Sequence, residues 1–228
     1  MWLREFAASY FVSINKELNP KLWEGDKLMP EVRDKLIRIA EAFREFVAID
    51  LNVIDYTMTG SNANYTWTKY SDLDLHIIVR GSVGPEAREL FNAKKALWAE
   101  HHDITIRGLP VECYIQGEDE RHHSSGVYSV KDDKWLMVPR KIKPSIDDSA
   151  VERKLDSITH DVTMAVTAGD IRKLEQVKER ISTMRKSGLE RAGEWSTENL
   201  AFKALRNMGV IDQLTDKIRE LEDQDLSL

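Results

Sequence analysis

Two aspartates, Asp72 and Asp74, interrupt a stretch, SDLDLHIIV, that otherwise has the apolar character of a buried β-strand. Because alternate side chains of a strand share a face, these two carboxylates would point the same way, roughly 7 Å apart. Two like charges at that distance are costly unless a cation or water offsets their repulsion. The spacing therefore suits a metal site. The same pattern would arise without a metal site if Asp72 lay in the preceding turn and Asp74 were exposed on a strand edge.

A third acid and a glycine–serine pair extend the pattern. Glu112 interrupts another apolar strand, VECYI, so that it faces one side while Val111 and Cys113 face the core. Gly60 and Ser61 follow a predicted strand, and a turn of that kind offers backbone N–H groups and a hydroxyl to a phosphate. Three acids on one sheet beside such a turn suit two divalent metals and the phosphate chain of a nucleotide.

In order and spacing, this set resembles the DNA polymerase β-type nucleotidyltransferase superfamily, with Gly60-Ser61, then Asp72-x-Asp74 in a strand, then an acid in a later strand. The resemblance covers about residues 53–116. It implies a small mixed sheet with helices packed on it. It also implies an enzyme that moves a nucleoside monophosphate from an NTP, ATP above the others, to a hydroxyl with release of pyrophosphate.

The resemblance assigns roles to the residues of the motif. Asp72 and Asp74 would bind both metals, Mg²⁺ or Mn²⁺, while Glu112 would bind the catalytic one. Glu112 would also help to accept the proton of the attacking hydroxyl. The β- and γ-phosphates would be held by Gly60, Ser61 and Asn62.

Basic residues outside the motif leave two interpretations open. The segment from Arg121 to Lys143 holds six basic residues and two acids, an excess of positive charge in an acidic protein. It would bind the triphosphate or a polyanionic acceptor, or it would be a charged hairpin that only faces solvent. Lys69 would contact phosphate or be solvated in the same way. The candidates in the segment are Lys131, Lys134, Arg140 and Lys141.

Aromatic residues and histidines near the motif also have two interpretations. Three aromatic residues lie in the loop before the aspartates: Tyr65, Trp67 and Tyr70. They would stack on a base or anchor the loop to the sheet, and we favour the second. His76 shares the face of the aspartates and would support a metal-bound carboxylate or simply be satisfied inside the fold, which we favour. The pairs His101-His102 and His122-His123 lack the i, i+4 spacing of a zinc site, so a solvated surface is expected.

The elements that would position these residues follow from the hydrophobic period. Strands are predicted at residues 53–60, 72–79, 103–108 and 111–116, with a hairpin at 126–130 and 134–138. Helices are predicted at residues 3–11, 32–47, 85–102, 151–166, 171–184 (ending near Gly188), 197–208 and from 210 onward. Ser196 or Thr197 would cap the helix at 197–208, and Gly169 and Gly209 would end helices. The expected class is α/β (α+β). N-terminal helices (1–50) would pack on a nucleotidyltransferase core (51–145), followed by a C-terminal helical bundle region (146–228).

Composition limits the function classes. The chain has 228 residues, 42% hydrophobic and 32% charged, with a net charge of −6, which disfavours bulk DNA binding. One cysteine, Cys113, excludes an intrachain disulfide and favours a reducing, cytoplasmic location. No apolar run reaches the roughly 18 residues of a membrane span, so no membrane partner is expected.

Several questions stay open at the level of sequence. The expected partner is a nucleoside triphosphate, and the acceptor would be RNA, a protein, a small molecule or a second nucleotide. One alternative is a catalytically silent nucleotide-binding or partner-binding module of the same fold. Another is a regulatory component of a toxin–antitoxin or defence pair. The related synthetases that make alarmone nucleotides by pyrophosphate transfer fit the Gly-Ser and Asp-x-Asp motif less well.

Overall fold

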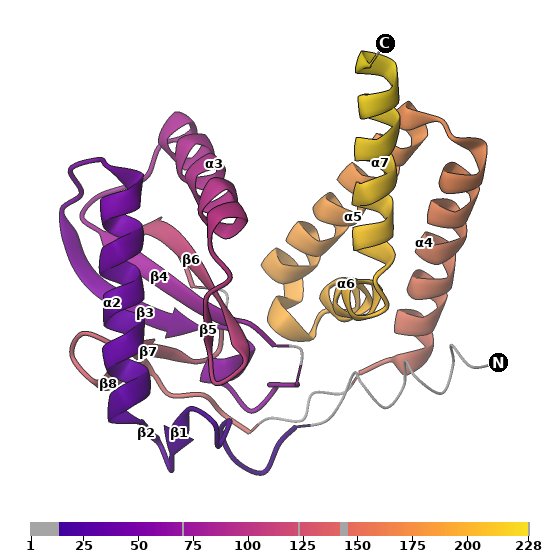
Figure 1. Ribbon diagram of the computed structural model, residues 1–228. Coiled ribbons are helices and arrows are strands. Elements are labelled where there is room, and N and C mark those ends of the chain that lie inside the picture. The colour runs from indigo at the N-terminus through magenta and orange to yellow at the C-terminus, as the bar shows by residue number, and fades with distance from the viewer. Residues whose placement is uncertain (1–13, 70, 123, 142–145, 228) are drawn as a thin grey trace. The chain divides into compact units, whose positions relative to one another are not determined.

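The computed structural model describes residues 14–69, 71–122, 124–141 and 146–227 (Figure 1). They fall into two compact units, one within residues 14–141 and one within residues 146–227. Each unit has its own hydrophobic core. The helix expected at residues 3–11 lies outside the described residues. In the described part of the chain, no helix combines the length and the apolar content that a membrane span needs.

The first unit is built on a six-stranded mixed sheet with the strand order β5-β6-β4-β3-β7-β8. Its strands are β3 (Val53–Thr59), β4 (Leu73–Val79), β5 (Thr105–Ile106), β6 (Leu109–Gly117), β7 (Val127–Ser129) and β8 (Lys134–Met137). A two-stranded ribbon, β1 (Trp23–Glu24) and β2 (Lys27–Leu28), precedes them. The predicted α/β class and the β7–β8 hairpin are confirmed.

Strands β4 and β6 are the parallel pair of this sheet, and its other pairs are antiparallel. A parallel pair needs a crossover connection, which helix α3 (Pro85–His101) supplies. The crossover matters for the site because it sets two strands side by side with the same direction. Residues at matching positions of β4 and β6 then present their side chains on the same face.

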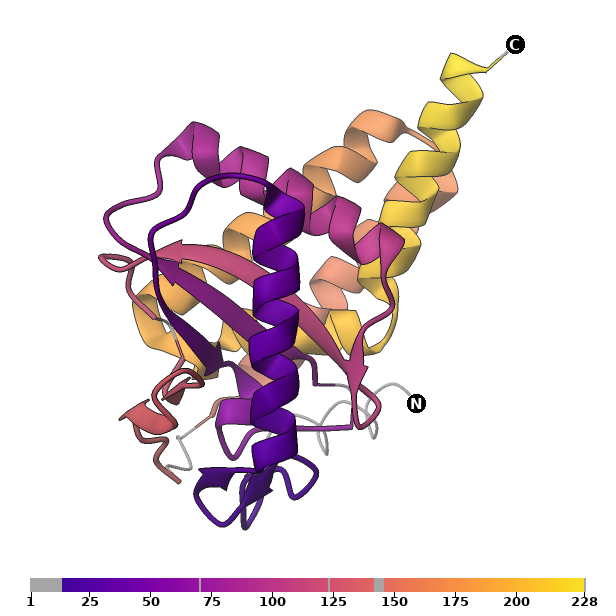
Figure 2. The same ribbon diagram turned by 60° about the vertical axis from the view of Figure 1, so that its left-hand side comes forward.

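Two helices, α2 (Pro30–Val47) and α3, pack on one face of the sheet (Figure 2). The apolar residues of β4 that pack into this core are Leu73, Leu75 and Ile77, all fully buried. The residues between them, Asp74 and His76, face the other side and are partly exposed. The alternation predicted from SDLDLHIIV is therefore confirmed, and it leaves the acids on the face that the two helices do not cover.

The strand predicted at residues 103–108 is much shorter than expected. Only Thr105–Ile106 form β5, because the chain turns at Arg107 and Gly108, which have φ angles of 52° and 78°. β5 pairs only with Leu109 and Pro110 of β6. The Val111 N–H still donates to the carbonyl of Ile104 at 3.0 Å, and from Glu112 onward β6 is an edge strand of the described sheet, so side chains from α3 can reach past it.

The second unit is a bundle of α4 (Asp148–Ala168), α5 (Ile171–Ala192), α6 (Thr197–Asn207) and α7 (Val210–Leu226) around one apolar core. The predicted ends are confirmed at two places. Gly169 is the left-handed C-cap of α4, and the Ser196 side chain accepts a hydrogen bond from the Asn199 N–H as the N-cap of α6. Both residues satisfy backbone groups that a helix end leaves unpaired.

The sequence predicted that α5 ends near Gly188. Instead, the helix continues to Ala192. The position of Gly188 is explained by packing. Gly188 is buried, and a Cβ atom placed there would lie 2.5 Å from the Cβ of Glu198 and 2.8 Å from the Oγ of Ser196. The missing side chain lets α5 approach the start of α6.

Replacing Gly188 with alanine is therefore expected to destabilise the protein. In an exposed helix this change stabilises by about 1 kcal/mol, but here overpacking reverses the sign, with a loss of about 1–3 kcal/mol. Chemical denaturation followed by circular dichroism measures the difference. Ser187→Ala, at the exposed neighbour on the same helix, is the control and should be close to neutral. A Gly188→Ala protein more stable than the parent would contradict the packing described.

Candidate active site

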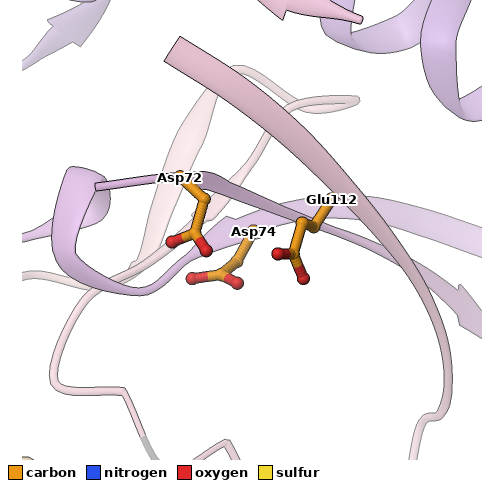
Figure 3. Close-up of side chains that lie close together, drawn as sticks. All are labelled: Asp72, Asp74 and Glu112. Carbon is orange, nitrogen blue, oxygen red and sulfur yellow. The ribbon is translucent and has the colours of Figure 1, made fainter. Parts of the chain in front are cut away.

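The three predicted acids converge at one end of the parallel strand pair (Figure 3). Asp74 of β4 and Glu112 of β6 are partners in the strand register, and Asp72 stands immediately before β4. One carboxylate oxygen from each residue lies within 4.8 Å of the others, and all three residues are partly exposed. Among the described residues, these acids form the one group of three that could hold a metal ion.

This group fits a hard divalent cation. Carboxylate oxygens are the ligands that Mg²⁺ and Mn²⁺ prefer, and neither thiolate nor imidazole takes part. Oxygens 4.8 Å apart or closer can contact one cation placed between them, since metal–oxygen distances in such sites are about 2.0–2.6 Å. The donor set and its spacing are therefore compatible with a hard divalent cation.

Gly60 lies directly against this cluster. It follows Thr59, the register partner of Asp74, and its backbone has φ 75° and ψ −161°, a conformation essentially restricted to glycine. A Cβ atom at this position would lie only 1.8 Å from Oδ2 of Asp74. The Gly60 N–H donates a hydrogen bond to Oγ of Ser124 at 3.2 Å. Glycine is therefore required here because the carboxylate occupies the space of a side chain.

The side chain of Asn62 fixes the loop after Gly60. Ser61 begins a short 3₁₀ helix, Ser61–Ala63, and Asn62 within it is fully buried. The Asn62 amide donates to the carbonyl of Asp72 at 2.7 Å and accepts from the Asn19 amide at 2.8 Å. Its side chain therefore positions Asp72, and a phosphate contact by Asn62 stays a prediction.

Glu112 has two partners that bind the same oxygen. The Lys95 ammonium donates to Oε2 of Glu112 at 2.7 Å, and the Tyr114 hydroxyl donates to it at 2.6 Å. Burial raises the pKa of Glu112, but the hydrogen bonds from Lys95 and Tyr114 outweigh it and bring this pKa below its ordinary value. Burial, with the nearby carboxylates, raises the pKa of Tyr114, which stays protonated as a donor.

Sequence reasoning missed Lys95. It placed Tyr114 on the face of Glu112, but no motif singles out one lysine of a crossover helix that also carries Lys94. The available signal is helical spacing, because Lys95 stands four residues after Phe91 and three before Trp98, the two buried residues of α3. That spacing places Lys95 near the sheet-facing stripe of α3.

The part of the chain that carries this geometry matches a known family. The nucleotidyltransferase domain family matches residues 36–155, just over half of the chain, and this range contains all three acids. The chain belongs to this family. The resemblance to polymerase β-type nucleotidyltransferases is thereby confirmed, and the chain is a transferase of nucleotidyl groups.

Two solved structures are also similar to this nucleotidyltransferase. A STING-associated CdnE c-di-GMP synthase from Capnocytophaga granulosa is 14% identical, over 87% of this chain and 84% of that one, with a TM-score of 0.24. The spectinomycin adenyltransferase AAD(9) from Enterococcus faecialis is 12% identical, over 84% and 99% of the two chains, with a TM-score of 0.25. No curated protein matches the chain significantly.

Two lysines predicted to bind phosphate lie far from the acids of this nucleotidyltransferase. The Lys131 ammonium donates to the carbonyl of Ile54 at 3.1 Å, near the start of β3, whereas Gly60 follows its end. Ile54 and Gly60 are six residues apart along the strand, which corresponds to about 20 Å. Lys134 pairs with Asp132 at 2.9 Å in the same hairpin. These contacts place the β7–β8 turn at the end of the sheet away from Gly60, so we do not carry Lys131 and Lys134 forward as phosphate contacts at the acid cluster.

The other basic candidates are exposed. The Lys141 ammonium lies 4.6 Å from the centre of the Tyr65 ring and donates to the carbonyl of Lys16. These contacts tie Lys141 to the loop that contains Tyr65. Arg140 is exposed beside it. Lys69 is exposed in the turn before Asp72, and its contact with phosphate stays a prediction.

Trp67 anchors the loop through its ring nitrogen, and Tyr65 does so by packing against the core of the first unit, as favoured from the sequence. The Trp67 ring nitrogen donates to the carbonyl of Glu17 at 3.0 Å, and the Asn15 amide donates to the carbonyls of Tyr65 and Trp67 at 3.1 and 2.7 Å. Tyr70 lies outside the described residues. These bonds hold the loop that ends at Asp72.

The histidines have different surroundings. His76 stacks on Tyr114, with ring centres 4.8 Å apart, and its Nδ1 has no hydrogen-bond partner among the described residues. Burial, with His122 nearby, lowers the pKa of His76 to about 4, so its ring is neutral. The His102 ring lies against Trp98 at 4.0 Å, while His101 meets Phe46 edge-on. His123 lies outside the described residues.

Proposed function

We propose that this nucleotidyltransferase moves a nucleoside monophosphate from an NTP to a hydroxyl acceptor and releases pyrophosphate, with Asp72, Asp74 and Glu112 holding Mg²⁺ or Mn²⁺. The observation that carries the proposal is the convergence of these three carboxylates within 4.8 Å, inside the range that matches the family. ATP is the expected donor.

The residues of the site divide the work. Asp74 lies between the other two acids and is pressed against Gly60, which fixes its carboxylate. Asp72 is held through its backbone by Asn62. Glu112 receives hydrogen bonds from Lys95 and Tyr114, which keep it ionised, so that it can serve as a ligand and accept a proton. When bound, the divalent metal supplies charge neutralisation for the phosphates and activation of the acceptor hydroxyl.

Phosphate recognition is assigned to the turn that starts at Gly60. The turn precedes the 3₁₀ helix of Ser61 and stands beside Asp74, so a phosphate bound by the metal would lie close to the Ser61 hydroxyl and the backbone. Lys69 is the nearest predicted lysine in sequence to the acids, two residues after Trp67 and three before Asp72. We retain Ser61 and Lys69 as phosphate contacts.

Transfer of a label tests the proposal and identifies the acceptor. Each α-³²P-labelled NTP would be incubated with the protein and Mg²⁺ or Mn²⁺, with and without RNA, protein or small-molecule acceptors. The expected result is label in one acceptor class, lost in the Asp72→Asn/Asp74→Asn double variant. NTP binding without any labelled product, under all of these conditions, would contradict transfer and support a silent nucleotide-binding module.

A further inference from the structure

Lys95 places a positive charge directly on the acid cluster. Its ammonium lies 2.7 Å from Oε2 of Glu112 and 3.5 Å from the centre of the Tyr114 ring. The side chains of Lys95 and Glu112 are 25% and 39% exposed, so the pair is partly shielded from water. An ion pair of this kind is stronger than one at a fully exposed surface.

The fold holds Lys95 in this place. Phe91 and Trp98, four residues before and three residues after it, are buried in the core of the first unit, which fixes the rotation of α3. Because β6 is an edge strand at Glu112, the lysine side chain can pass the edge and reach the face of the acids. The aromatic ring of Tyr114, with its negative face, gives the ammonium a second favourable contact.

The ammonium and the Tyr114 hydroxyl together occupy one oxygen of Glu112. Both donate to Oε2, at 2.7 and 2.6 Å, and Oε1 carries neither of these bonds. A cation that binds the cluster therefore meets a ligand that already has a fixed positive partner. Repulsion between that partner and a divalent ion grows as the two share one carboxylate.

We propose that Lys95 is a built-in competitor of the divalent metal, which lowers the metal affinity of the protein in the absence of nucleotide. The inference rests on the proposed metal site. As a consequence, the nucleotide-free cluster binds a divalent ion weakly. The negative phosphates of a bound nucleotide then raise the affinity for the metal. Lys95 thus acts on the metal through the charge of its ion pair with Glu112, rather than by orienting the carboxylate.

A purely structural lysine would behave in the opposite way. If Lys95 only kept Glu112 in the orientation that binds metal, its removal would loosen the carboxylate and weaken metal binding. If Lys95 competes with the metal, its removal strengthens metal binding. The sign of the change in affinity therefore separates the two roles.

Calorimetric titration of the nucleotide-free protein with Mn²⁺ at low salt, where screening is weak, measures that sign. Lys95→Met removes the charge and keeps the length of the side chain, and it should bind Mn²⁺ about tenfold more tightly or better. Lys95→Arg restores the charge and should match the parent. Lys94→Met is the matched control, since the Lys94 ammonium lies 5.6 Å from the Phe46 ring centre, away from Glu112, and its affinity should be unchanged.

Unchanged or weaker Mn²⁺ binding by Lys95→Met would overturn the inference, as would an equal gain in Lys94→Met. Lys95→Gln provides a second uncharged variant if the methionine protein folds poorly by circular dichroism. Asp74→Asn should abolish the binding heat, which assigns it to this cluster. If neither the parent nor Lys95→Met binds Mn²⁺, both this inference and the metal site fail. If transfer of label is observed without a Lys95 effect, only this inference fails.

Discussion

Asp74→Asn is expected to reduce nucleotidyl transfer by about 10³-fold or more while the protein remains folded. Asp74 is the central member of the cluster, with Glu112 as its register partner and Asp72 two residues before it. An amide is nearly the same size as a carboxylate but carries no charge, so the change removes a metal ligand without creating a cavity. Each tenfold in rate corresponds to about 1.4 kcal/mol, and loss of one anionic ligand removes several kcal/mol of stabilisation.

Single-turnover transfer of label from the preferred NTP measures this loss, with far-ultraviolet circular dichroism and thermal melting as tests of folding. Asp103→Asn, at an exposed position in the same unit, is the matched control and should retain parental activity. Activity of Asp74→Asn within a few-fold of the parent would show that the aspartate is not a ligand in the reaction.

Gly60→Ala is expected to lose activity about 100-fold or more, because a displacement of about 1 Å in a reacting group can cost that much. Two effects combine at this position. The φ angle of 75° strains any residue with a Cβ atom, and the new Cβ would overlap Oδ2 of Asp74, 1.8 Å away. The overlap forces either the turn or the carboxylate to move.

Gly81→Ala separates these two effects. Gly81 also has a positive φ angle, 81°, in the same unit, but no heavy atom lies within 4 Å of a Cβ atom placed there. Both variants should lose about 1–3 kcal/mol of stability from backbone strain, measured by denaturant unfolding. Only Gly60→Ala should lose transfer activity. Equal activity in the two alanine variants would refute the idea that Asp74 requires the space beside Gly60.

The central part of the site was accessible from sequence because it follows a short-range rule. Alternation along one strand places Asp72 and Asp74 on one face, and the same rule orients Glu112. Their meeting needs one further step, the parallel pairing of β4 with β6, which a helix between two strands makes predictable. The α/β class and most helix bounds depend on the same local periodicity.

The features that sequence could not place depend on long-range packing. Lys131 and Lys134 were grouped with the phosphate site by charge alone, but strand direction puts their turn at the far end of β3. Gly188 was interpreted as a helix end, although close approach to Glu198 requires it within the helix. The engagement of Lys95 with Glu112 depends on the rotation of α3 against the sheet, and no local pattern reports it.

The most direct test of this account is the location of Mn²⁺ in crystals of the protein grown with a non-hydrolysable NTP analogue. Anomalous diffraction at the manganese edge identifies the ion without reference to activity. A peak is expected within coordination distance of carboxylate oxygens from Asp72, Asp74 and Glu112, with analogue phosphates beside Gly60 and Ser61. Ordered analogue with no manganese at these three acids, or with manganese bound elsewhere, would contradict the assignment of the cluster as the metal site.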